Sequence, residues 1–299
     1  MIKVFEGFSG YGGASFGLRK AGIDFEVIGY SEIDKGAIKC YELNHPNIKN
    51  YGDISKINPN DLPYFDLFTG GFPCQDVSLA GKRDLSKGRT NLYLEILRIV
   101  SVKKPKFLLL ENVKGLESME INGRKLNHII INDLNKLGYG VCYRLLNSKD
   151  YGIPQNRERV WFVCKLGNWN FNEFHFPEKE ELKIGWRHFE DNSINFIKVK
   201  KTPSRDIMKK KCRNITKEKV IGTISNKQDR FPNSGIIDYE DYYRFLTPIE
   251  CFRLMGFFKD EINLDGLSLA QKYKLAGNGW DINLVSKIFK KLKKHLQGI

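Results

Sequence analysis

The sequence predicts an α/β fold, in which helices cover a mostly parallel sheet and a second, smaller lobe is attached. Two observations lead to this prediction. Strand-like and helix-like patterns alternate from residue 1 to about 166, and the patterning is lost between about 170 and 240, where charges accumulate. Such alternation is typical of parallel strands joined by helical crossovers.

The predicted strands are short apolar runs separated by helical patterns. They are Lys3–Phe8, Phe25–Ser31, Phe65–Thr69, Phe107–Leu110, Val141–Leu146 and Val160–Cys164. The helical patterns include Asn91–Val102 and Leu126–Leu137. Near the end of the chain, apolar residues recur at helical spacing at Ile282, Val285, Ile288, Phe289, Leu292 and Leu296. We expect this last helix to pack back on the large domain.

The poorly patterned region is strongly basic. The range Lys198–Lys219 contains ten basic and two acidic residues, which gives a net charge of +8. A solvated loop face or a disordered tail would have the same composition. Because isolated apolar residues such as Ile215 and Ile224 punctuate the region, we interpret it as a small folded lobe with a basic face.

Composition favours a nucleic-acid partner. The 299 residues include 41% hydrophobic residues, enough for a sizeable core, and the net charge is +14. A basic protein attracts polyanions, although many proteins are basic without binding one. The six cysteines form no C-x-x-C pair, which predicts no zinc site and a reducing cytosol. We expect no signal peptide, and no apolar run approaches the roughly 18 residues of a membrane span.

A glycine-rich turn and an acid follow the first two predicted strands. The first strand runs into Phe8-Ser9-Gly10-Tyr11-Gly12-Gly13, and the second ends at Ser31-Glu32. Glycines there let backbone approach a ligand closely, and an acid after the second strand commonly accepts hydrogen bonds from a ribose. The pair predicts a nucleoside-bearing cofactor, and several cofactors would satisfy it.

Reactive side chains follow other predicted strands. Cys74 lies in Phe72-Pro73-Cys74-Gln75, which follows Phe65–Thr69 and a Gly-Gly turn, and Glu111 follows Phe107–Leu110. Because ligands bind at the carboxyl ends of strands in open α/β sheets, both are candidate site residues. A buried cysteine is more often a small hydrophobe, and Glu111 could be an exposed acid at a helix start. Arg157 and Arg159 would face the same way on an extended chain, toward an anion, a base edge or surface partners.

These blocks, in this order, resemble those of bacterial DNA (cytosine-5) methyltransferases. The resemblance spans residues 4 to about 285 and is carried by Phe8–Gly13, Ser31-Glu32, Gly52-Asp53-Ile54, Gly71–Gln75, Glu111-Asn112-Val113, Gln155–Arg159, Arg244–Phe257 and Gly277-Asn278. It implies a Rossmann-like S-adenosylmethionine-dependent methyltransferase sheet with a smaller target-recognition domain. The implied boundaries are 1–186 for the catalytic domain, 187–242 for target recognition and 243–299 for the return to the catalytic domain.

Three positions depart from the family pattern. The family usually has Asp where this chain has Glu6, and an aromatic residue where it has Ile33. Its Gly-Asn-Ser-Val block reads Gly277-Asn278-Gly279-Trp280 here. None of these changes removes a chemical group that the reaction needs, although they affect the expected cofactor site.

The resemblance implies a role for each candidate residue. Cys74 is the covalent nucleophile toward cytosine C6, Glu111 binds the N3/N4 edge, Arg159 contacts the O2 side and Arg157 the negative charge of the site. The implied cofactor is S-adenosylmethionine, with S-adenosylhomocysteine as product and no metal. Its implied contacts are Phe8, Gly10, Gly12, Gly13, Glu32, Ile33, Asp53, Ile54, Pro73, Leu92 and Asn278.

The implied partner is double-stranded DNA, with the target cytosine flipped out of the helix. Asp76–Arg89 has the composition of a mobile loop that closes over DNA. The predicted DNA contacts are Lys82, Arg83, Lys87 and Arg89 in this segment and Lys209, Lys210 and Lys211 in the smaller lobe. We expect a monomer in the cytoplasm of a bacterial or phage-infected cell, with no membrane association. A cognate restriction endonuclease acting on the same site is a candidate partner.

Two alternative functions stay open on the sequence. An RNA cytosine-5 methyltransferase has a similar fold, but its second lobe carries a different pattern, which we do not find. A catalytically silent DNA-binding protein is disfavoured because Cys74, Glu111 and both arginines are all present.

Overall fold

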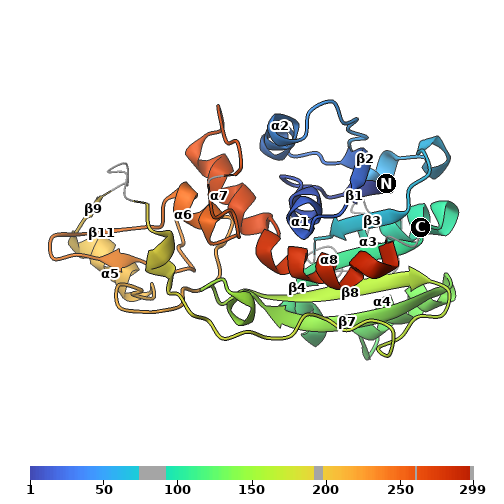
Figure 1. The fold of residues 1–299 in the computed structure, drawn as a ribbon. Helices are drawn as coiled ribbons and strands as arrows, with labels where there is room; N and C mark the ends of the chain where they lie inside the picture. The colour runs from blue at the N-terminus through green and yellow to red at the C-terminus, as the bar shows by residue number, and fades with distance from the viewer. Residues whose placement is uncertain (74–91, 192–197, 260, 297–299) are drawn as a thin grey trace.

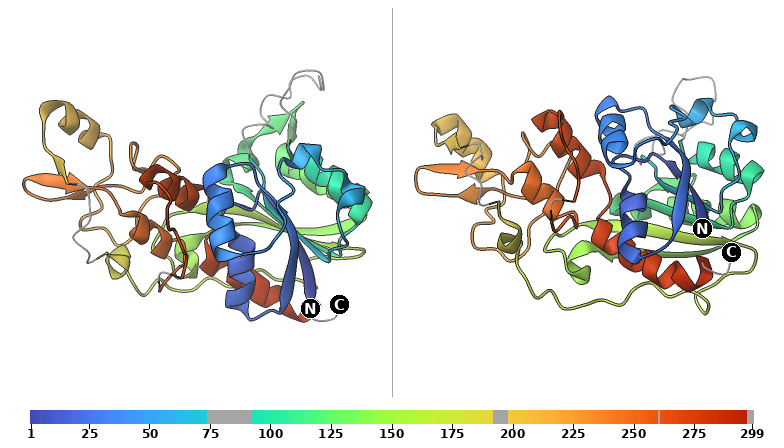
Figure 2. Two further views of the ribbon diagram at one scale, coloured as in Figure 1. Left: turned by 90° about the horizontal axis from the view of Figure 1, so that it is seen from above. Right: turned by 45° about the horizontal axis from the view of Figure 1, so that its top comes forward.

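The structure is a computed structural model that describes residues 1–73, 92–191, 198–259 and 261–296. A large lobe contains the main sheet, and a smaller lobe extends from one end of it (Figures 1 and 2). No helix in these described ranges is long and apolar enough to cross a membrane.

The main sheet has six strands in the order β2-β1-β3-β4-β8-β7. They are β1 (Ile2–Gly7), β2 (Phe25–Ser31), β3 (Leu67–Gly71), β4 (Phe107–Val113), β7 (Tyr139–Asn147) and β8 (Glu158–Leu166). β1 to β4 pair in parallel, whereas β8 runs antiparallel to both β4 and β7. The predicted mostly parallel α/β sheet is confirmed, and the reversed β8 is a feature that the sequence patterns did not reveal.

Helices cover both faces of this sheet. On one face lie α1 (Gly13–Ala21) and α8 (Ile282–Leu296), and on the other α3 (Leu92–Lys103) and α4 (Leu126–Lys136). Successive strand residues alternate between the two cores, as Val4 and Phe5 do in β1. The close approach of α1 and α8 requires Gly17, because a Cβ there would lie 2.5 Å from Val285 Cγ1.

The smaller lobe is built on a three-stranded antiparallel sheet. Its order is β10-β11-β9, formed by Ile237–Asp238, Tyr242–Arg244 and Val199–Lys200, with α5 at Pro203–Lys210. Trp186 is fully buried beneath it and donates its indole hydrogen to the Ile215 carbonyl at 3.0 Å. The basic region is therefore folded, its buried residues such as Ile215 and Ile237 are continuous with a core of the large lobe, and the boundaries at 187 and 242 stay predictions.

A buried ion pair joins the smaller lobe to the segment that returns to the large one. Arg244 in β11 donates to both carboxylate oxygens of Glu250 in α6 (Pro248–Arg253), at 2.8 and 3.0 Å, and both side chains are buried. Arg244 also bonds Glu190, at 2.8 Å. Removal of either partner would leave a buried charge uncompensated and lower the stability of this connection between the lobes.

The remaining elements complete the large lobe and its connections. They are α2 (Lys35–Asn44), α7 (Leu269–Asn278), β5 (Glu120–Ile121), β6 (Arg124–Lys125) and the 3-10 helices at Ile54–Lys56, Pro59–Asp61, Lys114–Ser118, Ser148–Tyr151 and Trp186–Phe189.

Candidate active site

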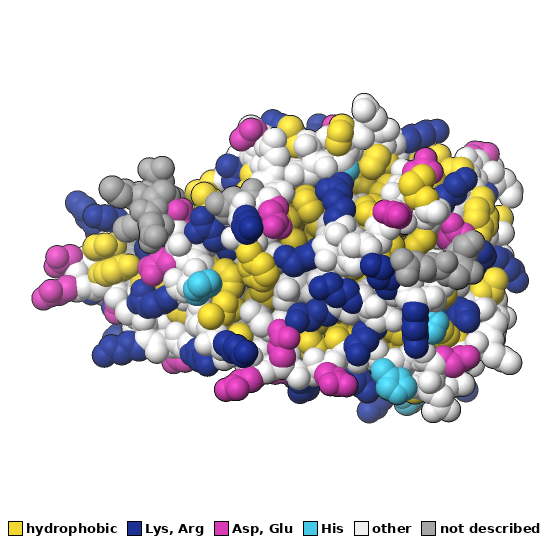
Figure 3. All heavy atoms as spheres, viewed as in Figure 1, with side chains coloured by type: hydrophobic (Ala, Val, Ile, Leu, Met, Phe, Trp, Pro, Cys, Tyr) yellow, Lys and Arg dark blue, Asp and Glu magenta, His cyan; other side chains and the backbone are white. Residues whose placement is uncertain are grey.

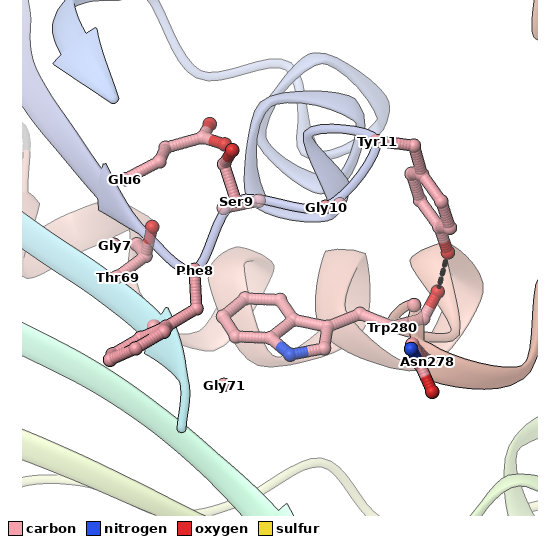
Figure 4. A pocket seen from close by; sticks show the side chains of 14 residues that line it. Glu6, Gly7, Phe8, Ser9, Gly10, Tyr11, Thr69, Gly71, Asn278 and Trp280 are labelled. Atoms are coloured by element: carbon pink, nitrogen blue, oxygen red, sulfur yellow. Dashed lines mark hydrogen bonds between the residues drawn. The ribbon is translucent and has the colours of Figure 1, made fainter. Parts of the chain in front are cut away.

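The order of the strands creates a ligand crevice at one edge of the sheet. From β1 the chain crosses to β2 on one side and then to β3 on the other, so the strand order reverses between β1 and β3. Ligands of open α/β sheets bind outside the carboxyl ends of strands at such a point. A cavity of about 40 Å³ lies there (Figure 4). It is lined by the β1–α1 turn, the end of β3 and the turn at 278–280 before α8.

The glycine-rich turn wraps this cavity through left-handed backbone. Phe8, Gly10 and Gly12 have φ values of 52, 56 and 83°. A Cβ on Gly12 would lie 2.3 Å from His45 Nε2, so only glycine fits. Phe8 is the one non-glycine residue of the three, and the left-handed conformation is unfavourable for it. Such a conformation persists only where the surrounding structure holds it, which is common at functional sites.

Glu32 lies against the turn, and its contact with a ribose stays a prediction. Its Oε2 accepts the Gly10 amide at 3.0 Å, and its Oε1 accepts the amides of Ile33 and Asp34 at 2.8 and 2.9 Å. The Ile33 side chain is 70% exposed. Asp53 caps the following 3-10 helix, and its hydrogen bonds from Ser55 hold its pKa below the usual value.

The predicted cofactor residues divide into two groups. Phe8, Gly10, Gly13 and Asn278 line the cavity itself. The other seven are not among the residues that line it, and they are Gly12, Glu32, Ile33, Asp53, Ile54, Pro73 and Leu92.

Glu6 is one of the residues that line the cavity, and its side chain is buried. It accepts a hydrogen bond from the Ser15 hydroxyl. Burial disfavours the charged form and raises the pKa of Glu6 to about 7, against the lowering effect of Ser15. The cavity lining therefore includes a carboxyl group, that of Glu6, whose pKa is near neutrality.

Glu111 lies at the end of β4 and forms an ion pair with Arg159 of β8. Arg159 Nε is 2.9 Å from Glu111 Oε1, and both side chains are largely buried. Burial raises the pKa of Glu111, while Arg159, Arg157 and hydrogen bonds to the carboxylate oppose this shift. The contact between Glu111 and Arg159 was not predicted from the sequence, and their roles toward a base stay predictions.

Arg157 does not share that contact. Its guanidinium donates to three backbone carbonyls, those of Ile224 at 3.2 Å, Gly277 at 3.1 Å and Gly279 at 2.7 Å. The side chain is buried, which lowers its pKa to about 9. Arg157 therefore ties the smaller lobe to the turn before α8, and its expected contact with a substrate charge stays a prediction.

The segment leading to Cys74 is anchored by Asn112. Its amide donates to the Phe72 carbonyl at 2.9 Å, which joins the end of β3 to β4. Cys74 itself lies outside the described residues, as do Lys82, Arg83, Lys87 and Arg89.

The predicted lysines of the smaller lobe are in two different environments. Lys209 forms an ion pair with Asp238 at 2.7 Å, whereas Lys210 and Lys211 are exposed. Figure 3 shows Lys and Arg side chains spread over both lobes on the face in view. No group of three or more potential metal ligands occurs within the described part of the chain.

Three residues at this edge were not assigned a role from the sequence: Tyr11, Asn112 and Trp280. The Tyr11 hydroxyl donates to the Trp280 carbonyl, and the Trp280 ring lies across the cavity beside Phe8 (Figure 4). The signal available in the sequence was the departure of Gly279-Trp280 from the family pattern. The motif position of Asn112 gave no indication of the carbonyl that it binds.

Comparison with known proteins gives a consistent picture. The profile of the family described as C-5 cytosine-specific DNA methylase matches residues 2–294. Type II methyltransferase M2.ScrFI of Lactococcus lactis subsp. cremoris is 30% identical over 367 aligned positions, covering 98% of this chain and 99% of that protein. Orphan methyltransferase M.SPBetaI of Bacillus phage SPbeta is 41% identical over 54% of this chain and 44% of its own length.

The fold has solved counterparts as well. The crystal structure of the Dnmt2 methyltransferase of S. pombe superposes with a TM-score of 0.80 at 20% identity, over 99% of both chains. That likeness concerns the fold, whereas the profile match and the full-length relative concern the family. This chain therefore belongs to the C-5 cytosine-specific DNA methylase family and is a DNA (cytosine-5) methyltransferase.

Proposed function

We propose that this enzyme methylates C5 of a cytosine flipped out of a specific short double-stranded DNA sequence, through a covalent bond between Cys74 and C6. The observation that carries the proposal is the Glu111–Arg159 ion pair, which lies at the sheet edge next to the strand that leads to Cys74. A carboxyl held by an arginine at that edge suits recognition of the polar side of a pyrimidine ring.

Cytosine C5 is a poor nucleophile until a group adds at C6. In the proposed step, the Cys74 thiolate forms a bond to C6, and the electron pair displaced in the ring makes C5 enamine-like. Glu111 supplies a proton or a hydrogen bond at N3, which stabilises that charge, and Arg159 contacts O2. After C5 has been methylated, its proton is lost to solvent and the Cys74–C6 bond breaks, which restores the aromatic ring.

The raised pKa of Glu111 supports its part in this scheme, because burial favours the protonated carboxyl. Arg159 and Trp280 approach the Glu111 carboxylate, but they leave acceptor positions free for a base, since a carboxylate offers about four. A free thiol has a pKa of about 8.5, so the site must also favour the thiolate of Cys74.

Members of this family use S-adenosylmethionine, which supplies an electrophilic methyl group. The residues at the crevice suit the ribose and adenine parts of this cofactor. Glu32, which accepts the Gly10 amide of the glycine turn, would bind the ribose hydroxyls, Asp53 would receive the adenine amino group, and Phe8 and Asn278 line the cavity. The exposed Ile33 is free to cover the adenine ring by apolar contact.

The smaller lobe is proposed to read the DNA sequence. Its exposed Lys210 and Lys211 would hold phosphates, while other side chains contact base edges. We propose that the enzyme acts as a monomer. The relatives named above include a type II and an orphan methyltransferase, so a companion endonuclease for this chain is a further proposal.

Bisulfite sequencing of DNA from cells that express the protein tests this function directly. Protected cytosines should recur in one short sequence and disappear with Cys74→Ala. Purified enzyme is then offered duplex DNA and transfer RNA in parallel. Methylation of the RNA alone would replace the proposal with the RNA alternative, and DNA binding without methyl transfer would identify a silent binding protein.

A further inference from the structure

Three paired residues of the main sheet lie next to the cavity residue Trp280, and one of them, Gly71, lines the cavity itself. Gly71 of β3 pairs with Glu111 of β4, which pairs with Trp161 of β8. Paired residues of adjacent strands present their side chains on the same face. Glu111 therefore stands between a bulky indole on one side and, at Gly71, a position with no side chain on the other.

Trp280 fills the space that Gly71 leaves open. A Cβ on Gly71 would lie 2.8 Å from Trp280 Nε1 and 3.0 Å from Glu111 Oε2, so both groups meet directly above the glycine. Trp280 Nε1 therefore faces Glu111 Oε2 above Gly71, and this approach lowers the pKa of Glu111. Because Arg159 engages Oε1, the carboxyl is held from two sides.

The Trp280 ring is itself fixed by packing and by backbone contacts. It meets Trp161 edge-on, with ring centroids 5.0 Å apart and planes at 71°, and it is 8% exposed. The Trp280 carbonyl accepts the Tyr11 hydroxyl, and Arg157 holds the neighbouring Gly279 carbonyl. A Cβ on Gly279 would lie 1.9 Å from the Tyr11 ring, so Tyr11, Gly279 and Trp280 are fitted to one another.

We propose that Trp280 is a positioning residue for methyl transfer: its indole hydrogen orients the Glu111 carboxyl, and its ring separates that carboxyl from the cofactor cavity. The inference rests on the proposed function of Glu111. It assigns a purpose to the tryptophan that stands where the family pattern has valine, a side chain without a hydrogen-bond donor.

The test compares two tryptophans that change in the same way. Trp280→Phe keeps an aromatic ring against Trp161 but removes the hydrogen that reaches Glu111. Trp169→Phe is the matched control, because its buried indole packs on Phe107, Phe174 and His295 and does not line the cavity. Thermal unfolding of both variants is measured first, and Trp280→Leu replaces Trp280→Phe if the latter does not fold.

Single-turnover methylation of duplex DNA is then followed from mildly acid to alkaline pH. Trp280→Phe should slow methyl transfer by about tenfold, the effect of one hydrogen bond to an ionisable group. It should also move the alkaline loss of activity to higher pH, because the bond from Trp280 lowers the pKa of Glu111. Trp169→Phe should keep the parent pH profile and a rate within about twofold, since its indole contacts neither Trp280 nor the cavity.

Glu111→Gln, measured in the same series, separates this inference from the proposed function. If Glu111→Gln is inactive while Trp280→Phe matches the parent in rate and pH profile, the role of Trp280 is refuted and that of Glu111 stands. Equal losses in both phenylalanine variants, with no shift in pH profile, would also refute it, because packing alone would explain them. Near-normal activity of Glu111→Gln would instead overturn the proposed function.

Discussion

Arg159 Nε lies 2.9 Å from Glu111 Oε1, across the antiparallel pair β4 and β8. Glu111 is in register with Trp161, so Arg159 is the diagonal neighbour on the same face. Burial raises the pKa of the carboxyl and the guanidinium lowers it. The reversed direction of β8 therefore brings the arginine to the catalytic edge of an otherwise parallel sheet.

Replacing Glu111 with glutamine should slow methyl transfer by roughly 10²- to 10³-fold, because glutamine cannot supply a proton. In the parent enzyme, the single-turnover rate should fall as pH rises through the raised pKa of Glu111, since the protonated form is lost. Single-turnover kinetics on duplex DNA measure both effects. Glu120→Gln, at an exposed position of β5, is the control and should match the parent. A near-normal rate for Glu111→Gln would remove this residue from the mechanism.

A duplex containing 5-fluorocytosine should trap a covalent adduct through Cys74, because fluorine cannot leave as the C5 proton does. Mass spectrometry of the digested complex locates the modified peptide. Cys74→Ala should form no adduct, whereas Cys212→Ala should form one at the parent level. Cys212 is the suitable control because it is part-buried, while Cys40, Cys142, Cys164 and Cys251 are buried. An adduct on any other cysteine would contradict the assignment.

Arg157→Met should lower the free energy of unfolding by roughly 3 kcal/mol, because three carbonyls lose a charged donor in a buried setting. Urea denaturation monitored by tryptophan fluorescence measures the change. Arg230→Met is the matched control, since the Arg230 side chain is exposed and its pair with Asp229 lies at the surface, and it should cost less than about 1 kcal/mol. Equal stability of the two variants would show that Arg157 does not hold the 277–279 turn.

Glu6→Gln should remove part of the dependence of stability on pH. The pKa of Glu6 is raised from 4.5 to about 7, so the folded state binds a proton that the unfolded state has already released in this range. Its contribution is fully present below pH 4.5 and is lost as pH rises to about 7, in total roughly 3 kcal/mol.

Urea midpoints measured across this pH range for parent and variant provide the comparison. The parent should lose stability relative to Glu6→Gln as pH rises. Glu26→Gln, at an exposed position of β2, should follow the parent. Parallel curves for the parent and Glu6→Gln would show that Glu6 is not protonated in the folded protein.

Neutralising Lys210 and Lys211 with glutamine should weaken binding similarly on all duplexes and reduce the salt slope by about two, as expected for two phosphate contacts. Fluorescence anisotropy on two unrelated duplexes at several salt concentrations measures both quantities. Lys290→Gln with Lys291→Gln, exposed on α8, is the control with the same loss of charge and should leave the slope unchanged. Lys209 is better left in place because it pairs with Asp238. An equal change in both double variants would indicate a nonspecific effect of net charge.

The sequence alone determined the α/β class, the strand positions and the family, because these follow from local patterns. Apolar runs bounded by turn residues predict where strands begin and end, as β2 at Phe25–Ser31 shows with the same limits in prediction and structure. Glycines mark where backbone must turn, and the Gly10 and Gly12 conformations agree with that. Strand ends also meet at one edge by topology, which brings Glu111 to the crevice.

Only the tertiary structure decided which partners these residues meet. Arg157 and Arg159 are two residues apart, yet one holds backbone carbonyls of the 277–279 turn and the other holds Glu111. The position of Trp280 over Gly71 likewise depends on how the turn before α8 packs against the sheet. The physical reason is that such contacts join residues far apart in the chain. These contacts are determined by strand register and helix packing, and neither can be predicted from the spacing of residues over a short stretch of sequence.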